Sequence, residues 1–179
     1  MTIAYPLFMP PLELAEKGAK NWKKKEAQSY LNWFLNVRVE RVSHFLSFLD
    51  YQLTGENDTD LAIISKLVFS KINTPNFYSL REIDGAKQLN NEGLALASDM
   101  GLLLSTLLQK EKPSLSWRVG IGPKSYHSYN LPVLGPFEGN SNEVDLIFLS
   151  IVNTGYSINV LHNSYDWAGF LKSLVTKAI

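Results

Sequence analysis

The 179-residue sequence contains no cysteine. This absence excludes disulfide bonds, thiolate nucleophiles, iron–sulfur clusters and zinc sites built on cysteine. An excess of charge of one sign is also missing, because 17 basic residues balance 17 acidic residues. A neutral chain has no overall field that attracts a polyanion, so we expect no general nucleic-acid binding. Any side-chain chemistry therefore depends on carboxylates, histidines or hydroxyl groups.

Long hydrophobic runs are absent too. The longest apolar stretches, near residues 94–108 and 146–152, are interrupted by Asp99 or are shorter than the roughly 20 residues that a membrane-spanning helix needs. Three prolines within residues 6–11 break the amino-terminal segment, which lacks the pattern of a signal peptide. We therefore expect an unexported, cytoplasmic protein with no membrane partner.

The composition favours one globular domain over residues 1–179. Hydrophobic side chains make up 45% of the residues and charged ones 19%, as expected of a chain that buries a sizeable core. No repeat, low-complexity tract or long linker divides the chain. Residues 1–22 form a proline-containing arm, in which proline prevents a helix before Leu12.

Periodicity predicts helices through the first two thirds of the chain. Residues 23–53 lack glycine and proline and carry apolar side chains at helical spacing, which predicts one long helix or two in succession. A second helical pattern covers residues 57–72, and residues 77–91 are mostly polar, as in a loop. Residues 92–109 are apolar on nearly every side, so this helix should be central.

The remaining third predicts strands. Alternation over residues 115–121 indicates a half-buried strand, and a second is expected within 128–134. A hairpin is predicted from residues 144–152 and 156–161, around Asn153-Thr154-Gly155. An amphipathic helix follows Ser164. The predicted fold class is α+β: amino-terminal helices, an antiparallel meander of about four strands, and a carboxyl-terminal helix packed on the sheet.

The sequence does not match the catalytic and cofactor-binding motifs that it partly resembles. The glycines around residues 120–125 do not form a P-loop, because Trp117 stands at its first glycine position and Pro123 lacks a backbone N–H. The three histidines are not at metal-ligand spacing. Residues 162–166 contain His, Ser and Asp, but helix capping explains them more simply than a catalytic triad. We therefore predict no catalytic residue, metal or cofactor, and no enzyme activity.

Asp99 stands out because it is the one carboxylate inside an apolar helix. Such a group must be paired, hydrogen-bonded, exposed at a groove or protonated. A structural interpretation pairs it with Arg118 or Lys124. A functional interpretation places it in a cleft with nearby aromatic and titratable residues, namely Tyr126, His127 and Tyr129.

Acidic side chains gather in two segments. One is the polar loop 138–143 and the residues that follow it, and the other precedes and begins the helix predicted at 57–72. If the fold brings the loops together, they offer a surface that complements a basic partner. The candidate partner-binding residues are Glu138, Glu143, Asp145, Glu56, Asp58 and Asp60.

Several short motifs carry a resemblance: PPLEL at 10–14, WKKKEA at 22–27, YLNWF at 30–34, LASDMG at 96–101 and LSW at 115–117. In these the chain resembles a group of uncharacterised bacterial proteins. Similar proteins of this size without a catalytic motif are often immunity proteins, encoded beside polymorphic or contact-dependent inhibition toxins. The resemblance implies a protein partner, a toxin domain, and no active-site residues.

Three hypotheses follow, and each predicts a different surface. An immunity-type protein that occludes a toxin would present a flat acidic surface around residues 138–145. A small enzyme or ligand-binding domain would hold Asp99 beside a histidine in a concave pocket. A structural subunit of a larger assembly would expose an aromatic patch on the first long helix, formed by Trp22, Trp33 and Phe34.

Overall fold

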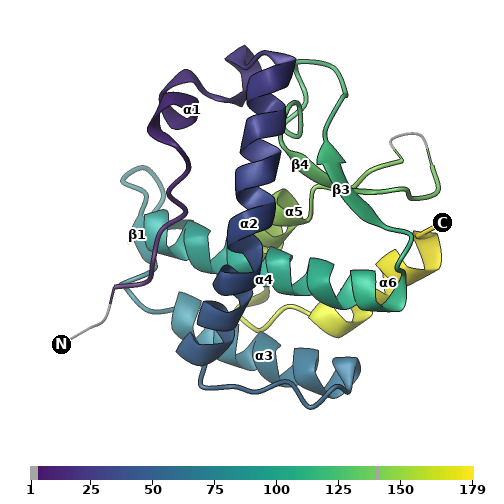
Figure 1. The fold of residues 1–179 in the computed structure, drawn as a ribbon. Coiled ribbons are helices and arrows are strands. Elements are labelled where there is room, and N and C mark those ends of the chain that lie inside the picture. The colour runs from purple at the N-terminus through teal and green to yellow at the C-terminus, as the bar shows by residue number, and fades with distance from the viewer. Residues whose placement is uncertain (1–3, 140–141) are drawn as a thin grey trace.

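The computed structural model describes residues 4–139 and 142–179, so Asn140 and Ser141 of the predicted polar loop lie outside the described residues. Figure 1 shows the order of elements. The helices are α1 (Leu12–Lys17), η1 (Ala19–Asn21), α2 (Lys24–Phe48), α3 (Asn57–Ile72), α4 (Asn91–Glu111), α5 (Leu146–Tyr156), the π-helical η2 (Ser157–Leu161) and α6 (Trp167–Lys177). The strands are β1 (Tyr78–Leu80), β2 (Lys87–Leu89), β3 (Ser116–Val119) and β4 (Pro132–Gly135).

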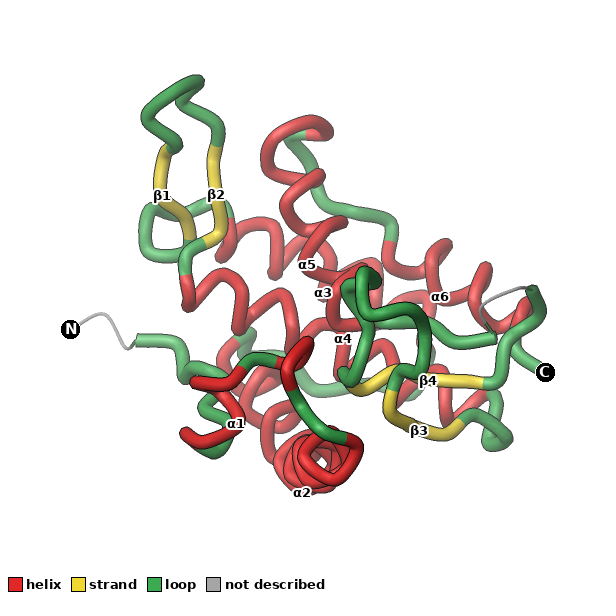
Figure 2. The backbone as a smooth tube through the Cα atoms, turned by 90° about the horizontal axis from the view of Figure 1, so that it is seen from above, coloured by secondary structure: helices red, strands yellow, loops and turns green. Residues whose placement is uncertain are grey.

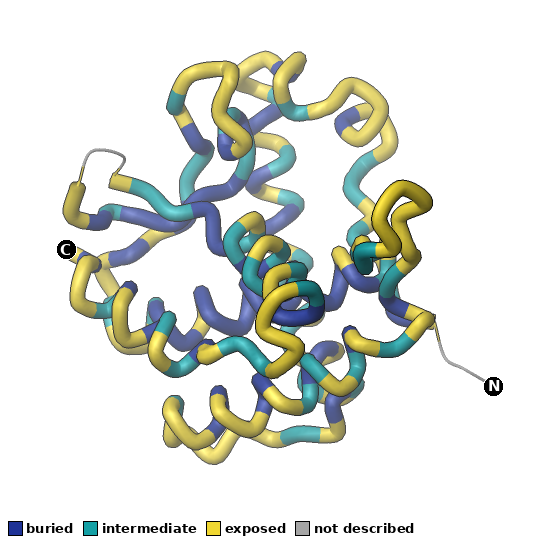
Figure 3. Tube along the Cα trace, turned by 180° about the vertical axis from the view of Figure 1, so that it is seen from behind, coloured by how far each residue is buried: buried dark blue, intermediate teal, exposed yellow. Residues whose placement is uncertain are grey.

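Helix α4 is the centre of the fold, as its apolar pattern predicts. Its side chains are buried along most of its length. It runs across the molecule between α2 on one side and α5 on the other (Figures 1 and 2), and it also contacts α3 and α6. The buried segments accordingly meet in the middle of the molecule, while the outer faces of the surrounding helices are exposed (Figure 3).

Two glycines let neighbouring segments approach the α4 backbone. A Cβ atom on Gly101 would lie 2.8 Å from the carbonyl oxygen of Leu146 and 3.1 Å from Ser150 Oγ, both in α5. A Cβ atom on Gly93 would lie 2.1 Å from the carbonyl oxygen of Phe77. Glycine costs helix stability in an interior position, and here the close packing of a second element explains its presence.

The predicted four-stranded meander is wrong. The described residues form two separate two-stranded antiparallel sheets, β1–β2 and β3–β4. Residues 144–161, expected to form a hairpin, instead form α5 and η2. Asp145 caps α5 by accepting a hydrogen bond from the Phe148 amide at 2.9 Å, and the apolar run after it packs on α4. A short run apolar on both faces fits a buried helix as well as a buried strand, and tertiary packing decides between them.

The segment 77–91, expected to be a loop, contains the β1–β2 hairpin, which projects from the helices (Figure 2). Its pairs run from Tyr78↔Leu89 to Leu80↔Lys87. The side chain of Asn159 in η2 holds the outer edge of β2. It accepts a hydrogen bond from the Lys87 amide at 2.9 Å and donates one to the Lys87 carbonyl at 2.8 Å.

The carboxyl-terminal helix forms as expected, but its cap and its packing differ from the prediction. Asp166, rather than Ser164, caps α6 by accepting from the Gly169 amide. The helix packs mainly against α3 and α4, and not on a sheet as predicted. An isolated bridge between Phe137 and Ala178 joins its end to the chain after β4.

The aromatic patch proposed for assembly is not exposed. Trp22 and Phe34 are only 7% and 2% exposed, and Trp33 is partly buried against the core. Trp33 packs on Phe8 of the arm and on Tyr30, with ring centroids 6.2 and 5.2 Å apart.

In the described part of the chain, no helix combines the length and apolar character needed to cross a bilayer.

Candidate functional site

Asp99 is part of a buried anchor rather than an open cleft. It is fully buried, and Arg41 of α2 donates to both of its oxygens, from Nε to Oδ1 at 2.9 Å and from Nη2 to Oδ2 at 2.5 Å. The Tyr5 hydroxyl donates to Oδ2 at 2.6 Å. The prediction that Asp99 pairs with Arg118 or Lys124 is therefore wrong.

The same anchor holds the amino-terminal arm on the helices. Arg41 Nη1 donates to the carbonyl oxygens of Pro6 and Leu7 at 2.8 and 3.1 Å. Burial raises the pKa of Asp99, and the hydrogen bonds from Arg41 and Tyr5 oppose this rise. Burial and the Asp99 charge both raise the pKa of Tyr5. These contacts occupy the carboxylate, so we interpret Asp99 as structural.

A signal for Arg41 exists in the sequence. It lies seven residues after Phe34 and four before Phe45, and both of these side chains are buried. These spacings put the three residues on one face of α2. An arginine in an apolar helix face and a carboxylate in an apolar helix together predict a buried ion pair.

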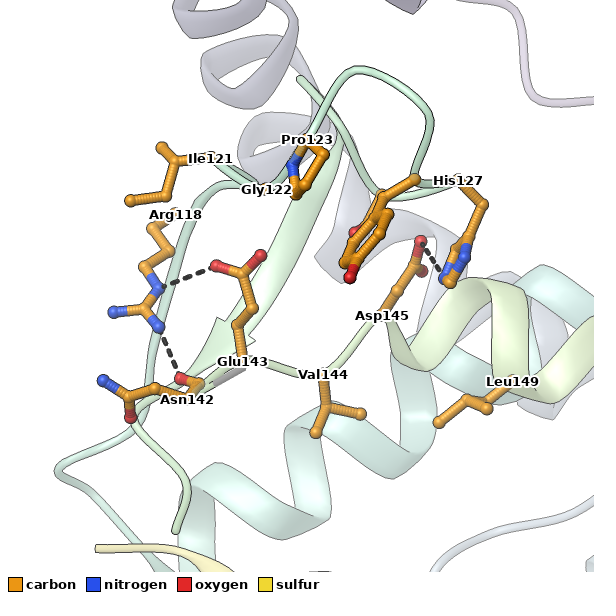
Figure 4. A pocket seen from close by; sticks show the side chains of 12 residues that line it. Arg118, Ile121, Gly122, Pro123, His127, Asn142, Glu143, Val144, Asp145 and Leu149 are labelled. Carbon is orange, nitrogen blue, oxygen red and sulfur yellow. Dashed lines mark hydrogen bonds and ion pairs between the residues drawn. The ribbon is translucent and has the colours of Figure 1, made fainter. Parts of the chain in front are cut away.

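An open pocket of about 700 Å³ lies between the loop after β3 and the segment that leads into α5. Figure 4 shows the ion pair of Arg118 and Glu143 at one side and His127 with Asp145 at the other. Tyr126 also lines it and is 55% exposed. The pocket therefore combines two carboxylates, an arginine, a histidine and an exposed aromatic ring.

The two carboxylates are held in surroundings that disfavour their charge. Burial raises the pKa of Glu143, and the Asp145 charge adds to this, whereas Arg118, with Nε 3.6 Å from Glu143 Oε2, opposes it. Burial also raises the pKa of Asp145, whereas the hydrogen bond from the Phe148 amide and the nearby His127 act to lower it. His127 Nε2 lies 3.9 Å from Asp145 Oδ2. An additional cation would stabilise both charges.

His127 is placed by stacking on α5. Its ring lies over that of Phe148, with centroids 3.9 Å apart and an interplanar angle of 24°. The imidazole remains substantially exposed. His127 therefore lines the pocket beside Asp145 without forming a hydrogen-bonded acid–base pair with it, because 3.9 Å exceeds hydrogen-bond distance.

The predicted site residues separate into different places. Glu143, Asp145, Tyr126 and His127 are brought together at the pocket. Asp99 belongs to the anchor, so the predicted cleft that combined it with His127 is wrong. Half-buried Tyr129 follows in the same loop, and exposed Glu138 donates its amide N–H to the Lys177 carbonyl oxygen.

The second predicted acidic segment has mixed roles. Glu56 is exposed, and Asp58 forms an ion pair with Lys172 of α6 at 2.7 Å. Asp60 is fully buried and accepts hydrogen bonds from the Tyr51 hydroxyl and from Thr54. The prediction that Asp60 lies on a partner-binding surface is therefore wrong. Its hydrogen bonds instead hold the loop that connects α2 to α3.

A second, smaller pocket of about 260 Å³ shares the wall formed by His127 and Asp145. Its remaining lining is mostly apolar and comes from the arm, α2, α4, the start of β4 with the residue before it, and α5. Sequence reasoning missed this pocket, because it is assembled from five separate segments. Among the described residues, no cluster of three or more His, Asp or Glu side chains is arranged to hold a metal ion.

No protein-family model, no curated protein and no solved structure matches this chain.

Proposed function

We propose that this chain is an immunity-type protein, which binds a cognate bacterial toxin and neutralises it by covering its active site or substrate surface. The larger pocket is the centre of the proposed interface, and it receives a basic side chain of the toxin. The single observation that carries this proposal is the pair of partly desolvated carboxylates, Glu143 and Asp145, lining one open pocket.

The physical argument is one of charge compensation. Arg118 forms an ion pair with Glu143, with Nε 3.6 Å from Oε2, and burial raises the pKa of Glu143 in spite of it. A lysine or arginine from a partner would offset the burial that now raises both carboxyl pKa values. Charged contacts of this kind confer specificity and fast association on protein complexes.

The surroundings of the pocket support a protein partner. Ile121 is 85% exposed and Tyr126 is 55% exposed, and both line the pocket. Phe148 and Val152 on α5 are exposed as well. Aromatic residues are enriched at protein interfaces, where apolar side chains surround polar anchors. The acidic region is thus concave with an apolar border, instead of the flat surface that the sequence predicted for an inhibitor.

The test pairs affinity capture with a growth assay. The tagged chain is used to capture proteins from its native cell, and each captured protein is expressed in a susceptible host with or without the chain. The proposal predicts a stoichiometric partner that stops growth alone and is neutralised by the wild-type chain. The variant Glu143→Lys should lose both capture and protection.

A matched control separates the pocket from overall charge. Glu82 is an exposed acid in the β1–β2 connection, on the other side of the molecule from β3 and β4 (Figure 1). Glu82→Lys makes the same change in net charge and should retain protection. Equal protection by Glu143→Lys and the wild-type chain would move the interface elsewhere. Absence of any growth-inhibiting partner would contradict the immunity function itself.

A further inference from the structure

The smaller pocket has walls rich in aromatic rings. Phe8 of the arm, Tyr30 and Phe34 of α2, and Phe148 of α5 all line it, together with the His127 ring. Aromatic faces carry partial negative charge and attract organic cations within about 6 Å of the ring centroid. The arm already shows this behaviour, since the Arg41 guanidinium lies 4.4 Å from the Phe8 ring centroid.

One buried carboxylate gives this pocket its charge. Asp145 is 8% exposed and lines the pocket together with Tyr30. Burial and the Asp145 charge raise the pKa of Tyr30 to about 12. The Phe148 amide donates to Asp145 Oδ1 at 2.9 Å, the Ile147 amide also hydrogen-bonds this carboxylate, and His127 Nε2 lies 3.9 Å from Oδ2. Burial still raises the pKa of Asp145, so a cation in the pocket would stabilise its charged form.

We infer that this pocket binds an organic ammonium ion, in which an aliphatic or aromatic substituent lies among the rings of Tyr30, Phe34 and Phe148 and the ammonium group faces Asp145. The combination of a carboxylate with several aromatic walls selects an alkylammonium over a neutral molecule of the same shape. It also selects against anions, which Asp145 repels. This site adjoins the proposed toxin contact and shares Asp145 and His127 with it, whereas Glu143 lines only the larger pocket and so distinguishes the two.

The volume limits the size of the ligand. At about 260 Å³ the pocket is slightly smaller than the roughly 300–1,000 Å³ of sites for drug-sized ligands. A compact amine with one ring or one short branched chain suits this space. The amine is either a free small molecule or the side chain of a lysine in a peptide, since both present the same ammonium group.

The test is a calorimetric titration of the full chain with matched probes. The probes are 2-phenylethylammonium, its neutral counterpart 2-phenylethanol, and Nα-acetyl-lysine amide. The inference predicts that 2-phenylethylammonium or the lysine amide binds at least tenfold more tightly than the neutral alcohol. Tighter binding of the lysine amide assigns the ammonium group to a peptide, and tighter binding of the arylalkylamine assigns it to a free amine.

Variants identify the group that recognises the charge. Asp145→Asn keeps a side chain that caps helices well, so the fold should be retained, and a thermal melt checks this. It should abolish the preference for the cation and leave binding of the neutral alcohol intact. Glu143→Gln, which alters the larger pocket only, should leave all affinities within twofold. Equal binding of cation and alcohol to the wild-type chain, no binding of any probe, or a preference that survives Asp145→Asn would overturn the inference.

Discussion

Arg41 and Asp99 are joined by two hydrogen bonds at a place where the Arg41 side chain is 11% exposed and Asp99 is fully buried. Bringing such charges out of water costs several kcal/mol per ion, and their mutual attraction offsets this only while both are present. Tyr5 satisfies the remaining capacity of Oδ2. The pair therefore fixes where α2 crosses α4, and its individual members are not replaceable one at a time.

Arg41→Met should destabilise the fold by about 3–5 kcal/mol, because it leaves the Asp99 charge buried without its partner. The double variant Arg41→Met/Asp99→Leu should recover most of this loss. Urea unfolding of the three proteins measures the difference. Arg38→Met is the control, since Arg38 makes one 3.3 Å hydrogen bond to Gln109. A loss as large in Arg38→Met, or a double variant no more stable than Arg41→Met, would contradict this account.

Asp60 makes the stability depend on pH at the start of α3. Burial acts to raise the pKa of Asp60, but hydrogen bonds from Thr54, Tyr51 and Gly55 together hold it below its ordinary value. A depressed carboxyl pKa means that the folded state favours the charged form. Its stabilising contribution is therefore present above the unfolded pKa of about 3.9 and is lost as the pH falls through the folded pKa.

Asp60→Asn should lower the free energy of unfolding by about 1–3 kcal/mol at pH 7, since several hydrogen bonds to a charged group are weakened. The difference from the wild type should shrink as the pH falls below about 4. Chemical denaturation at pH 7 and pH 3 measures this change. The neighbouring exposed Glu56→Gln should change stability little at either pH, and a constant difference for Asp60→Asn would show that its charge is unimportant.

At the scale of elements, the contact with α4 determines that the segment of α5 folds as a helix. Its backbone approaches α4 at Gly101, and its buried Ser150 and Thr154 lie one helical turn apart. Asp145 caps the first turn. These tertiary contacts act on a segment whose local sequence suits either a strand or a helix.

Gly101→Ala and Gly155→Ala test this close packing as a pair. The new methyl group at Gly101 would lie 2.8 Å from the Leu146 carbonyl oxygen, so this variant should lose about 1–3 kcal/mol. At Gly155, no atom outside its chain neighbours and the nearby backbone of α5 lies within 4 Å of the new group, and better helix propensity should stabilise by about 0.5–1 kcal/mol. Thermal melts measure both, and stabilisation by Gly101→Ala would disprove the tight contact.

The helices could be predicted from the sequence because their signals are local. The pattern over residues 57–72 matches α3, and the all-round apolar pattern of residues 92–109 correctly predicted a central helix. The strand predicted at 115–121 corresponds to β3, shortened to Ser116–Val119. The hairpin at 144–161 failed because a helical cap and a contact with α4 override the turn signal of Asn153-Thr154-Gly155.

The candidate site was predictable only in part. The acidity of Glu143 and Asp145 and the clustering of Tyr126 and His127 are visible in the sequence, and the fold places all four at one pocket. The grouping with Asp99 failed because the direction of its side chain depends on the crossing of α2 and α4. That crossing sets which face of each helix is buried, and single-sequence periodicity carries no information about it.

At the scale of the whole molecule, residues 5–9 of the arm link distant parts of the fold. Tyr5 is buried, with its ring 4.8 Å from that of Phe48 in α2 and 6.2 Å from that of Phe77 before β1. Phe8 packs on Trp33 and lines the smaller pocket. The arm thus contributes to the core and to a candidate ligand site at once.

Tyr5→Ala should release the arm, because it removes both a buried ring and the hydrogen bond to Asp99. We expect a loss of about 3–5 kcal/mol in stability, as for other buried aromatic residues. Hydrogen exchange should increase at residues 5–9 and along the facing part of α2. Tyr5→Phe keeps the ring and should lose only about 1.5–3 kcal/mol, the value of a hydrogen bond to a charged group. Unchanged exchange in Tyr5→Ala would show that the arm is held by other contacts.

The two hydrogen bonds between the Asn159 side chain and the Lys87 backbone affect self-association. An uncovered strand edge is a template on which another chain can add a strand, and natural proteins protect such edges. The amide and carbonyl of Lys87 face away from β1, yet both are already bonded to one carboxamide side chain. Asn159 thus occupies the edge of β2 in the manner of a one-residue third strand. The projecting hairpin is thereby closed to edge-to-edge aggregation at Lys87.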